Sequence, residues 1–541
     1  MKNLAAATLA LLTFTAGASA QETQRYLVGT KHPFRAGALA AVLRDARGGF
    51  TPRSVAGFDV FDGFAADLTS SEAAALARNP SVRWVEPVLE RHAFALVARN
   101  PQAQTVPYGV DLIHTREAWS ATHVATTNVV VIDTGVDYRH PELKAVYAGG
   151  YNFVANNSDP FDDGAHGTHV AGTIAAANND VGVVGIAPDV RLWALKVLGS
   201  DGSGSSESVV KALDWIIAKK SASGGNWVAN LSLGASRPST AEREAFARAI
   251  NAGLLIVAAS GNESTATIAA PISYPAAYDG VVAVGAVDDK LSIASFSNQG
   301  PQLDVVAPGV DVLSTLPVGS GSIAWIAAGT TTYGGVALTG AKRGTVTGEY
   351  VFCGLGKTED IPASVAGKIA LIKRGDIRFN EKARNAKQAG AIAVAIFNFD
   401  ASPMNWTLTP DDDPSAKSYD WPVTVGITQA DGEALVAHNA GTITVVNESD
   451  DYGVYSGTSM ASPHVAGAAA FLWSTSPSAS ASDVAAALTQ TASDLGVPGI
   501  DNVYGSGIIN VFAAVVRLAP SSIFPPPTPP TTGRRILKRG H

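Results

Sequence analysis

Cysteine is almost absent from this chain of 541 residues, because Cys353 is the only one. No intrachain disulfide can therefore form, and stability has to come from packing or from bound ions. We expect Cys353 itself to be a small buried apolar residue. Charged side chains are also scarce, at 16% of residues with a net charge of -8. This composition favours neither nucleic acid nor an anionic membrane as a partner.

Long hydrophobic runs are missing as well. The apolar stretch Leu4–Phe14 follows Lys2 and precedes Ala18-Ser19-Ala20, which is the pattern of a secretory signal peptide with its cleavage site. The stretch is too short and too rich in alanine to span a membrane, and no later run reaches the required length. We therefore expect residues 1–20 to be a signal peptide and the mature protein to be secreted, extracellular and without a membrane span.

The most informative stretch is Gly457–His464, which is followed by the small apolar run Val465–Trp473. This pattern predicts a buried helix with the Ser459 hydroxyl at its N-terminus, where unpaired N–H groups and the helix dipole favour a developing anion. We expect Pro463 to lie in the first turn of that helix. A Gly-x-Ser turn is also a common helix cap, so a catalytic interpretation needs a base and a carboxylate elsewhere.

Both groups are present upstream. Asn128–Ile132 reads as a β-branched strand that is buried on both faces and ends at Asp133. In open α/β sheets ligands bind at the carboxyl ends of the strands, which is where Asp133 falls. His166 then stands at a glycine-flanked helix start within Asp162–Gly172. The chain order Asp, His, Ser is one of the orders known for convergent catalytic triads.

Three motifs together closely resemble the catalytic signatures of the subtilisin-like serine proteases. They are Asp-Thr-Gly at 133–135, His-Gly-Thr-His-Val-Ala-Gly at 166–172 and Gly-Thr-Ser-Met-Ala-Ser-Pro-His at 457–464. Three long motifs in the right order are far more specific than any one of them. The resemblance implies an α/β fold with a parallel-sheet catalytic domain, and hydrolysis of peptide bonds through an acyl-enzyme.

The resemblance also assigns roles to the three residues. Ser459 would be the nucleophile, His166 the general base and then acid, and Asp133 the carboxylate that orients the imidazole. A zinc site made of His166 and His169 fails on spacing, because the zinc motif needs histidines four residues apart with a glutamate between them. We expect His169 to be a packed helix residue.

Substrate-binding residues are matched in the same way. Asn262 stands where the family has the asparagine that donates to the tetrahedral oxyanion, although a Gly-Asn pair is also a common turn. Glu263 matches a residue that lines the primary specificity pocket. The edge strand that pairs with the substrate backbone is matched by Ser232, Leu233 and Gly234.

Calcium is the cofactor that the resemblance implies, as a structural ion. The loop at 177–183 resembles the family's high-affinity calcium loop, and hard oxygen ligands suit this ion. Its ligands match Gln104, Glu142, Ala177, Asn179, Val181 and Val183, where the family usually has aspartate in place of Glu142. A second, weaker site would use Asp304 with the carbonyls of Ala276, Tyr278 and Val281. An ordinary surface loop and a surface acid remain the alternatives.

The rest of the chain divides around these motifs. Residues 21–102 resemble an inhibitor-like propeptide, a small α+β domain of βαβ-like order with a helix at about 37–44 and a processing point within 94–103. Residues 103–317 and 453–518 form the catalytic domain. Residues 318–452 resemble an inserted protease-associated domain, with a β-α-β unit over 367–398. Residues 519–541 form a proline-rich basic tail.

We therefore predict a secreted serine endopeptidase of broad specificity, made as a self-processing zymogen and acting as a monomer on protein or peptide substrates. Its own propeptide would be its intramolecular inhibitor. Two alternatives stay open: a processing protease of narrow specificity, and an inactive binding protein that uses the inserted domain. Retention of all four catalytic-type residues argues against the inactive protein.

Overall fold

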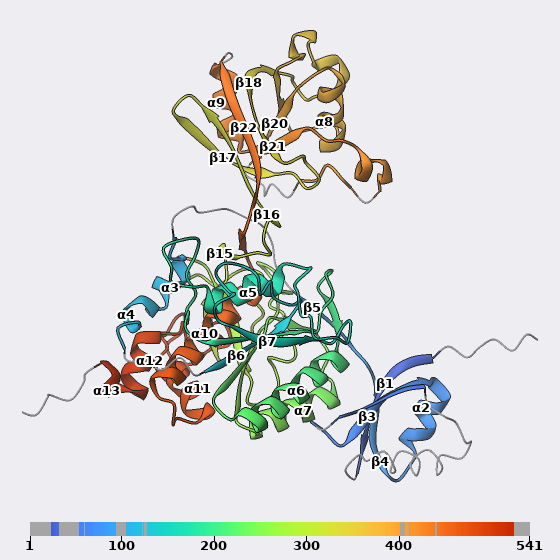
Figure 1. Cartoon of the computed structure of the whole chain (residues 1–541), viewed down its shortest axis with the longest axis vertical. Coiled ribbons are helices and arrows are strands. Elements are labelled where there is room, and N and C mark those ends of the chain that lie inside the picture. The colour runs from blue at the N-terminus through green and yellow to red at the C-terminus, as the bar shows by residue number, and fades with distance from the viewer. Residues whose placement is uncertain are drawn as a thin grey trace, which may run out of the picture. The chain divides into compact units, whose positions relative to one another are not determined.

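The computed structural model describes residues 23–31, 53–58, 60–93, 104–121, 123, 127–400, 406–410, 412–438 and 441–523 (Figure 1). It forms two compact units, residues 1–88 and 89–541. The predicted signal peptide, the predicted helix at 37–44 and the tail from residue 524 lie outside the described residues. The whole predicted processing region, residues 94–103, also lies outside the described residues.

The N-terminal unit is a four-stranded sheet with one described helix. The strands are β1 (Thr23–Thr30), β2 (Arg53–Phe58), β3 (Gly63–Thr69) and β4 (Val82–Pro87), in the order β2-β3-β1-β4. All of its hydrogen-bonded pairings are antiparallel. Strands β3 and β4 lie on either side of β1, run parallel to each other and are joined through α2, which is a split βαβ unit. Strand β2 was not predicted. Helix α2 (Ser70–Ala77) begins with a capping box formed by Thr69 and Glu72.

The larger unit is built on a seven-stranded sheet in which every pairing is parallel. In spatial order the strands are β14 (Val305–Pro308), β13 (Val282–Val287), β12 (Leu254–Ala259), β10 (Trp227–Leu231), β6 (Asn128–Asp133), β8 (Arg191–Lys196) and β7 (Tyr147–Asn152). Every residue of β6, β10, β12 and β13 is buried. Strands this apolar need cover on both faces, and the predicted α/β parallel-sheet fold is confirmed.

Helices cover both faces of this sheet, with α6 (Ser206–Ser223) and α7 (Thr240–Asn251) below β6 and β7 and α5 (His166–Ala175) above them in Figure 1. Helix α10 (Thr458–Thr475) packs on α5, β10, β12 and β13, and all of its residues but the last are buried. The smaller helices are α3 (Tyr108–Leu112), α4 (Thr115–Ala118), α11 (Ala481–Gln490), α12 (Val511–Leu518) and α13 (Pro520–Ile523). Within the described parts of the chain, no helix has the length and apolar character that crossing a membrane requires.

A closed barrel interrupts this unit between Gly321 and Asp450. Its strands, in order around the barrel, are β16 (Gly321–Ala328), β17 (Thr331–Ala337), β21 (Val423–Ile427), β20 (Ala393–Phe397), β19 (Ile369–Lys373), β18 (Gly344–Phe352) and β22 (Thr442–Asp450). Helices α8 (Phe379–Gln388) and α9 (Gln429–His438) accompany them. Strands β19 and β20 are parallel and joined through α8, as the β-α-β pattern predicts.

Two paired strands connect the barrel to the rest of the unit. Strand β15 (Val312–Thr315) leads toward the barrel and β23 (Tyr452–Tyr455) returns from it, and the two are antiparallel. Helix α10 begins at Thr458, three residues after β23 ends. The chain that returns from the barrel therefore runs directly into the helix that carries Ser459.

Candidate active site

Asp133 and His166 form a buried pair at the carboxyl edge of the sheet. Asp133 is the last residue of β6, and His166 is the first residue of α5. His166 Nδ1 lies 2.7 Å from Asp133 Oδ1, and the side chains are 6% and 0% exposed. A carboxylate in this position fixes the tautomer and the orientation of the ring, so that Nε2 is the basic nitrogen.

The loop before His166 is held by Asp162, a residue that sequence reasoning did not single out. Its buried carboxylate accepts hydrogen bonds from Thr134 Oγ1, the N–H groups of Gly164 and Ala165, and both N and Oγ1 of Thr168, at 2.6 to 2.9 Å. Burial raises the pKa of Asp162. Ala165, the residue before α5, has a left-handed backbone conformation with φ of 71°. Its methyl side chain cannot cap the helix. Asp162 therefore fixes the first turn of α5 from outside the helix.

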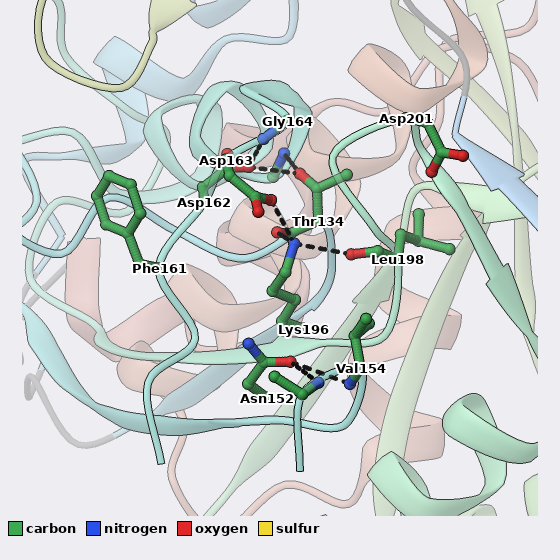
Figure 2. Close-up of polar contacts among 12 residues, drawn as sticks. Thr134, Asn152, Val154, Phe161, Asp162, Asp163, Gly164, Lys196, Leu198 and Asp201 are labelled. Carbon is green, nitrogen blue, oxygen red and sulfur yellow. Dashed lines mark hydrogen bonds and ion pairs between the residues drawn. The ribbon is translucent and has the colours of Figure 1, made fainter. Parts of the chain in front are cut away.

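Lys196 ties the ends of β6 and β8 to the same loop (Figure 2). Its ammonium donates to Thr134 O at 2.6 Å, Asp163 Oδ1 at 2.7 Å and Leu198 O at 2.9 Å. The lysine side chain is 4% exposed, so its charge needs these partners. The cluster holds the carboxyl edge of the sheet together where Asp133 ends its strand.

Ser459 is the second residue of α10 and is fully buried. Its Oγ donates to Ser232 O at 2.9 Å, and Ser232 Oγ donates in return to Ser459 O at 2.7 Å. The expectation for Pro463 was wrong, because this proline is the sixth residue of α10 and lies inside the helix. A proline has no N–H for the carbonyl four residues earlier, here that of Ser459. The Ser232 hydroxyl supplies the missing donor.

Asn262 lies against the start of the same helix. Its side-chain oxygen accepts from Thr458 N at 2.9 Å and from Thr458 Oγ1 at 2.8 Å. These two bonds assign the orientation of the amide and turn Nδ2 away from Thr458. An amide N–H that does not bond the start of the helix can donate a hydrogen bond to an anion.

The predicted substrate edge strand pairs with the chain's own extended segment β5 (Glu90–Ala93). Strand β11 (Leu233–Gly234) and β9 (Ser203–Ser205) flank β5 on its two sides, both antiparallel to it. Ser232 precedes β11 directly. Main-chain groups of residues 233 and 234 thus pair with an extended segment of the same chain, and their role in binding substrate stays a prediction.

The proposed calcium ligands lie together in large part. Gln104 Nε2 lies 2.9 Å from Ala177 O, 3.5 Å from Asn179 Oδ1 and 3.4 Å from the carbonyl oxygens of both Val181 and Val183. Four oxygens therefore converge on one point. Carbonyl and amide oxygens suit a hard cation. Among the described residues, no group of three or more His, Cys, Asp and Glu is placed to hold a metal.

Glu142 stands beside this group and is engaged by neighbours. Its carboxylate accepts from Asn179 Nδ2 at 3.0 Å and from the Tyr452 hydroxyl at 2.8 Å, and burial raises its pKa. At the second predicted ion site, Asp304 Oδ2 accepts from Ala283 N at 2.8 Å, and burial raises the pKa of this carboxyl as well. That site stays a prediction.

His169 is a packed residue, as expected. Its Nε2 lies 2.9 Å from Val312 O and 3.2 Å from Gly453 O, and its ring stacks on Tyr455 with centroids 4.5 Å apart. Burial lowers its pKa to about 3, so the ring is neutral near pH 7. It holds the β15 and β23 strand pair against α5.

A buried carboxylate and imidazole, a serine at a helix N-terminus and an amide donor beside it are the groups that acyl transfer by a serine hydrolase requires. Comparison with known proteins agrees: the chain matches the subtilase family over residues 125–340 and 410–507, and it belongs to that family. It is a subtilisin-like serine endopeptidase. A PA domain is matched over residues 346–435, which lie inside the barrel. The subtilase match also includes some barrel strands, because its first segment ends at residue 340 and its second begins at residue 410.

Individual relatives give the same result. Subtilisin E of Bacillus subtilis is 38% identical over 310 residues, which cover 56% of this chain and 76% of that protein. Subtilisin DY of Bacillus licheniformis is 45% identical over 216 residues, covering 40% of this chain and 76% of its own. The crystal structure of the psychrophilic subtilisin-like protease Apa1 from Pseudoalteromonas sp. AS-11 shares 34% identity with a TM-score of 0.53. It aligns with 78% of this chain and 99% of its own.

The hydrogen bond from the Ser232 hydroxyl to Ser459 O can be tested by substitution. Ser232→Ala removes the donor to Ser459 O, so we expect a loss of about 1–3 kcal/mol in the free energy of unfolding. Pro463→Ala restores an N–H to that carbonyl, so Ser232→Ala should cost less in the Pro463→Ala background. Part of the cost should remain there, because Asn230 Nδ2 also donates to the Ser232 hydroxyl at 3.0 Å. Thermal unfolding of the four proteins of this cycle, with a serine-protease inhibitor present, measures the difference. Equal costs in both backgrounds would show that the carbonyl does not depend on Ser232.

Proposed function

We propose that Asp133, His166 and Ser459 form the catalytic triad of this endopeptidase and that Asn262 donates to the oxyanion. The buried 2.7 Å contact between His166 Nδ1 and Asp133 Oδ1 is the observation that supports this most directly. Ser459 Oγ attacks the scissile carbonyl after its proton turns from Ser232 O to His166 Nε2. The imidazolium, stabilised by Asp133, then protonates the leaving amine.

The oxyanion of the tetrahedral intermediate would lie between Asn262 Nδ2 and the main-chain N–H of Ser459. The two bonds from Thr458 to the Asn262 side-chain oxygen support this assignment, because they hold the amide before substrate arrives. Donors that are fixed in advance stabilise the transition state without a reorganisation cost.

Substitutions at the two positions should differ in severity. We expect Ser459→Ala to lose about 10⁶ in turnover and Asn262→Ala roughly 10² to 10³, which are the losses measured for the corresponding substitutions in subtilisin itself. Initial rates on a tetrapeptide p-nitroanilide, with circular dichroism to show that each variant folds, give the comparison. Near-normal hydrolysis by folded Ser459→Ala would end the triad assignment.

We propose that the protein is made as a secreted zymogen, with a signal peptide at residues 1–20 and an inhibitory propeptide at 21–102. The pairing of β5 with β9 and β11 supports the inhibitory role, because this segment takes the place of an extended substrate strand. Cleavage would then fall shortly after Ala93, within residues 94–103, where the paired segment ends. The catalytic domain comprises residues 103–317 and 453–518.

Processing should depend on the chain's own active site. Ser459→Ala, purified from a host that lacks other proteases, is expected to keep its propeptide. The wild type from the same host should begin within residues 95–104. N-terminal sequencing and intact mass distinguish the two. A mature N-terminus on Ser459→Ala would assign the cleavage to another enzyme.

We propose a structural calcium ion held by Gln104, Glu142, Ala177, Asn179, Val181 and Val183. The convergence of four oxygens on the Gln104 amide supports this, since rotation of that amide turns its own oxygen toward the same point. When bound, the ion would join residue 104 to the 177–183 loop and add stability. Glu142, longer than the aspartate expected here, also accepts from Tyr452 on the strand returning from the barrel.

Removal of calcium should lower thermal stability more than initial activity, because this loop lies outside the proposed triad. An ion at about 100 times its dissociation constant stabilises by roughly 2.7 kcal/mol. We expect the melting temperature to fall in chelator, and Asn179→Ala to lose most of that response. Differential scanning calorimetry with excess calcium and with chelator measures both. Identical melting curves for the wild type would remove the ion from this account.

We propose broad specificity and a separate role for the barrel, which filters or recruits folded protein substrates. All four proposed catalytic residues lie outside the barrel, and its returning strand ends four residues before Ser459. A body attached this close to the nucleophile affects the approach of large substrates more than that of small peptides. A narrow-specificity processing protease remains the alternative for the same site.

Replacing Gly321–Asp450 by a short Gly/Ser linker keeps β15 and β23 paired and removes only the barrel. We expect kcat/KM on a tetrapeptide to stay within about threefold, since the triad geometry is untouched, and casein hydrolysis to change by more. Progress curves on the two substrates with the same enzyme preparation give the ratio. An unchanged ratio for a folded deletion variant would contradict the filtering role.

A further inference from the structure

Asn298 is a buried polar residue next to the proposed oxyanion and specificity groups, and none of the sequence motifs includes it. It lies in the connection between β13 and β14 and is 1% exposed. A buried amide has to satisfy both of its ends. Each end of the Asn298 side chain does so on the segment that carries Asn262.

The first set of bonds fixes the main chain on both sides of Asn262. Asn298 N donates to Gly261 O at 3.0 Å. Asn298 Oδ1 accepts from Glu263 N at 2.9 Å and from Ser264 N at 3.0 Å. The residues before and after the oxyanion donor are therefore bound to one residue from another loop.

The second set of bonds holds a carboxylate. Asn298 Nδ2 donates to Glu263 Oε2 at 2.5 Å, to Pro271 O at 2.9 Å and to Ser273 Oγ at 3.3 Å. Ser273 Oγ donates to the same Glu263 oxygen at 3.3 Å. Hydrogen bonds to an ionised acceptor are short and strong, so these donors restrict a side chain that is otherwise exposed.

Asn298 and Ser273 can come close to the Glu263 carboxylate because residue 261 is glycine. Its φ of +108° favours glycine, and a Cβ there would lie 2.5 Å from Ser273 Oγ and 2.6 Å from Glu263 Oε2. The amide, the hydroxyl and the carboxylate therefore gather in the space that a side chain at residue 261 would fill. Residue 261 therefore has to be glycine for two reasons, its backbone conformation and the space that the Glu263 carboxylate occupies.

We propose that Asn298 is a positioning residue with two effects, the placement of Asn262 and the anchoring of Glu263 as a fixed negative charge in the primary specificity pocket. Within the proposed broad specificity, the second effect favours one class of substrate, peptides with a cationic side chain immediately before the scissile bond. The inference rests on the proposed roles of Asn262 and Glu263. A purely structural asparagine would change the hydrolysis of all substrates alike, whereas this one changes their ratio.

The test compares two tetrapeptide p-nitroanilides that differ only in lysine or methionine before the scissile bond. In Asn298→Ala, we expect the lysine-to-methionine ratio of kcat/KM to fall about twofold to fivefold, as for a partly exposed ion pair. Turnover of the methionine substrate should fall about tenfold, because Asn262 shifts. In the Glu263→Gln background, Asn298→Ala should no longer change the ratio but should still lower turnover.

Two further variants serve as a second test and as a control. Ser273→Ala removes one donor to the carboxylate and should shift the ratio in the same direction by less, even if Asn298→Ala does not fold. Ser297→Ala is the matched control: this buried neighbour bonds Ala286 N and not Glu263, and it should leave the ratio unchanged. The proposal is overturned if neither Asn298→Ala nor Ser273→Ala changes the ratio. A wild type that hydrolyses neither substrate would instead defeat the proposed function.

Discussion

The structure depends on a buried carboxylate that must be paired where a parallel strand ends. Asp133 has no exposure to water, and an isolated charge there would be costly. His166 and the Thr134 N–H satisfy one of its oxygens, each at 2.7 Å. The same edge of the sheet is fixed by Asp162 and Lys196, whose bonds leave the loop before α5 little freedom. The imidazole is thus oriented by the fold before any substrate binds.

Much of this could be predicted from the sequence, because it depends on local patterns. The β-branched run ending at Asp133 indicated the buried parallel strand, and the small apolar residues after Ser459 indicated the buried helix α10. The apolar runs on either side of α8 predicted the β-α-β unit of the barrel. Long motifs in a fixed order then supplied the family, which the comparisons confirm.

What could not be predicted depends on partners that lie far apart in the sequence. Pro463 was expected in the first turn, because nothing near it in the sequence replaces the N–H that a proline lacks. The residue that does so, Ser232, is 231 positions earlier in the chain. Asn298 has no motif, since its bonds are to residues 25 to 38 positions earlier. The closure of the barrel likewise depends on β16 and β22, which are distant along the chain. Tertiary contacts, and not local propensity, decide these features.

The central claim is that Ser459 is activated by His166, and active-site labelling tests it most directly. The mature protein is treated with diisopropyl fluorophosphate, digested and mapped by mass spectrometry. We predict one phosphoryl adduct, on Ser459, that forms in step with the loss of peptidase activity and is absent in folded His166→Ala. A preparation that loses activity with the adduct on another residue, or that labels Ser459 equally without His166, would contradict the account.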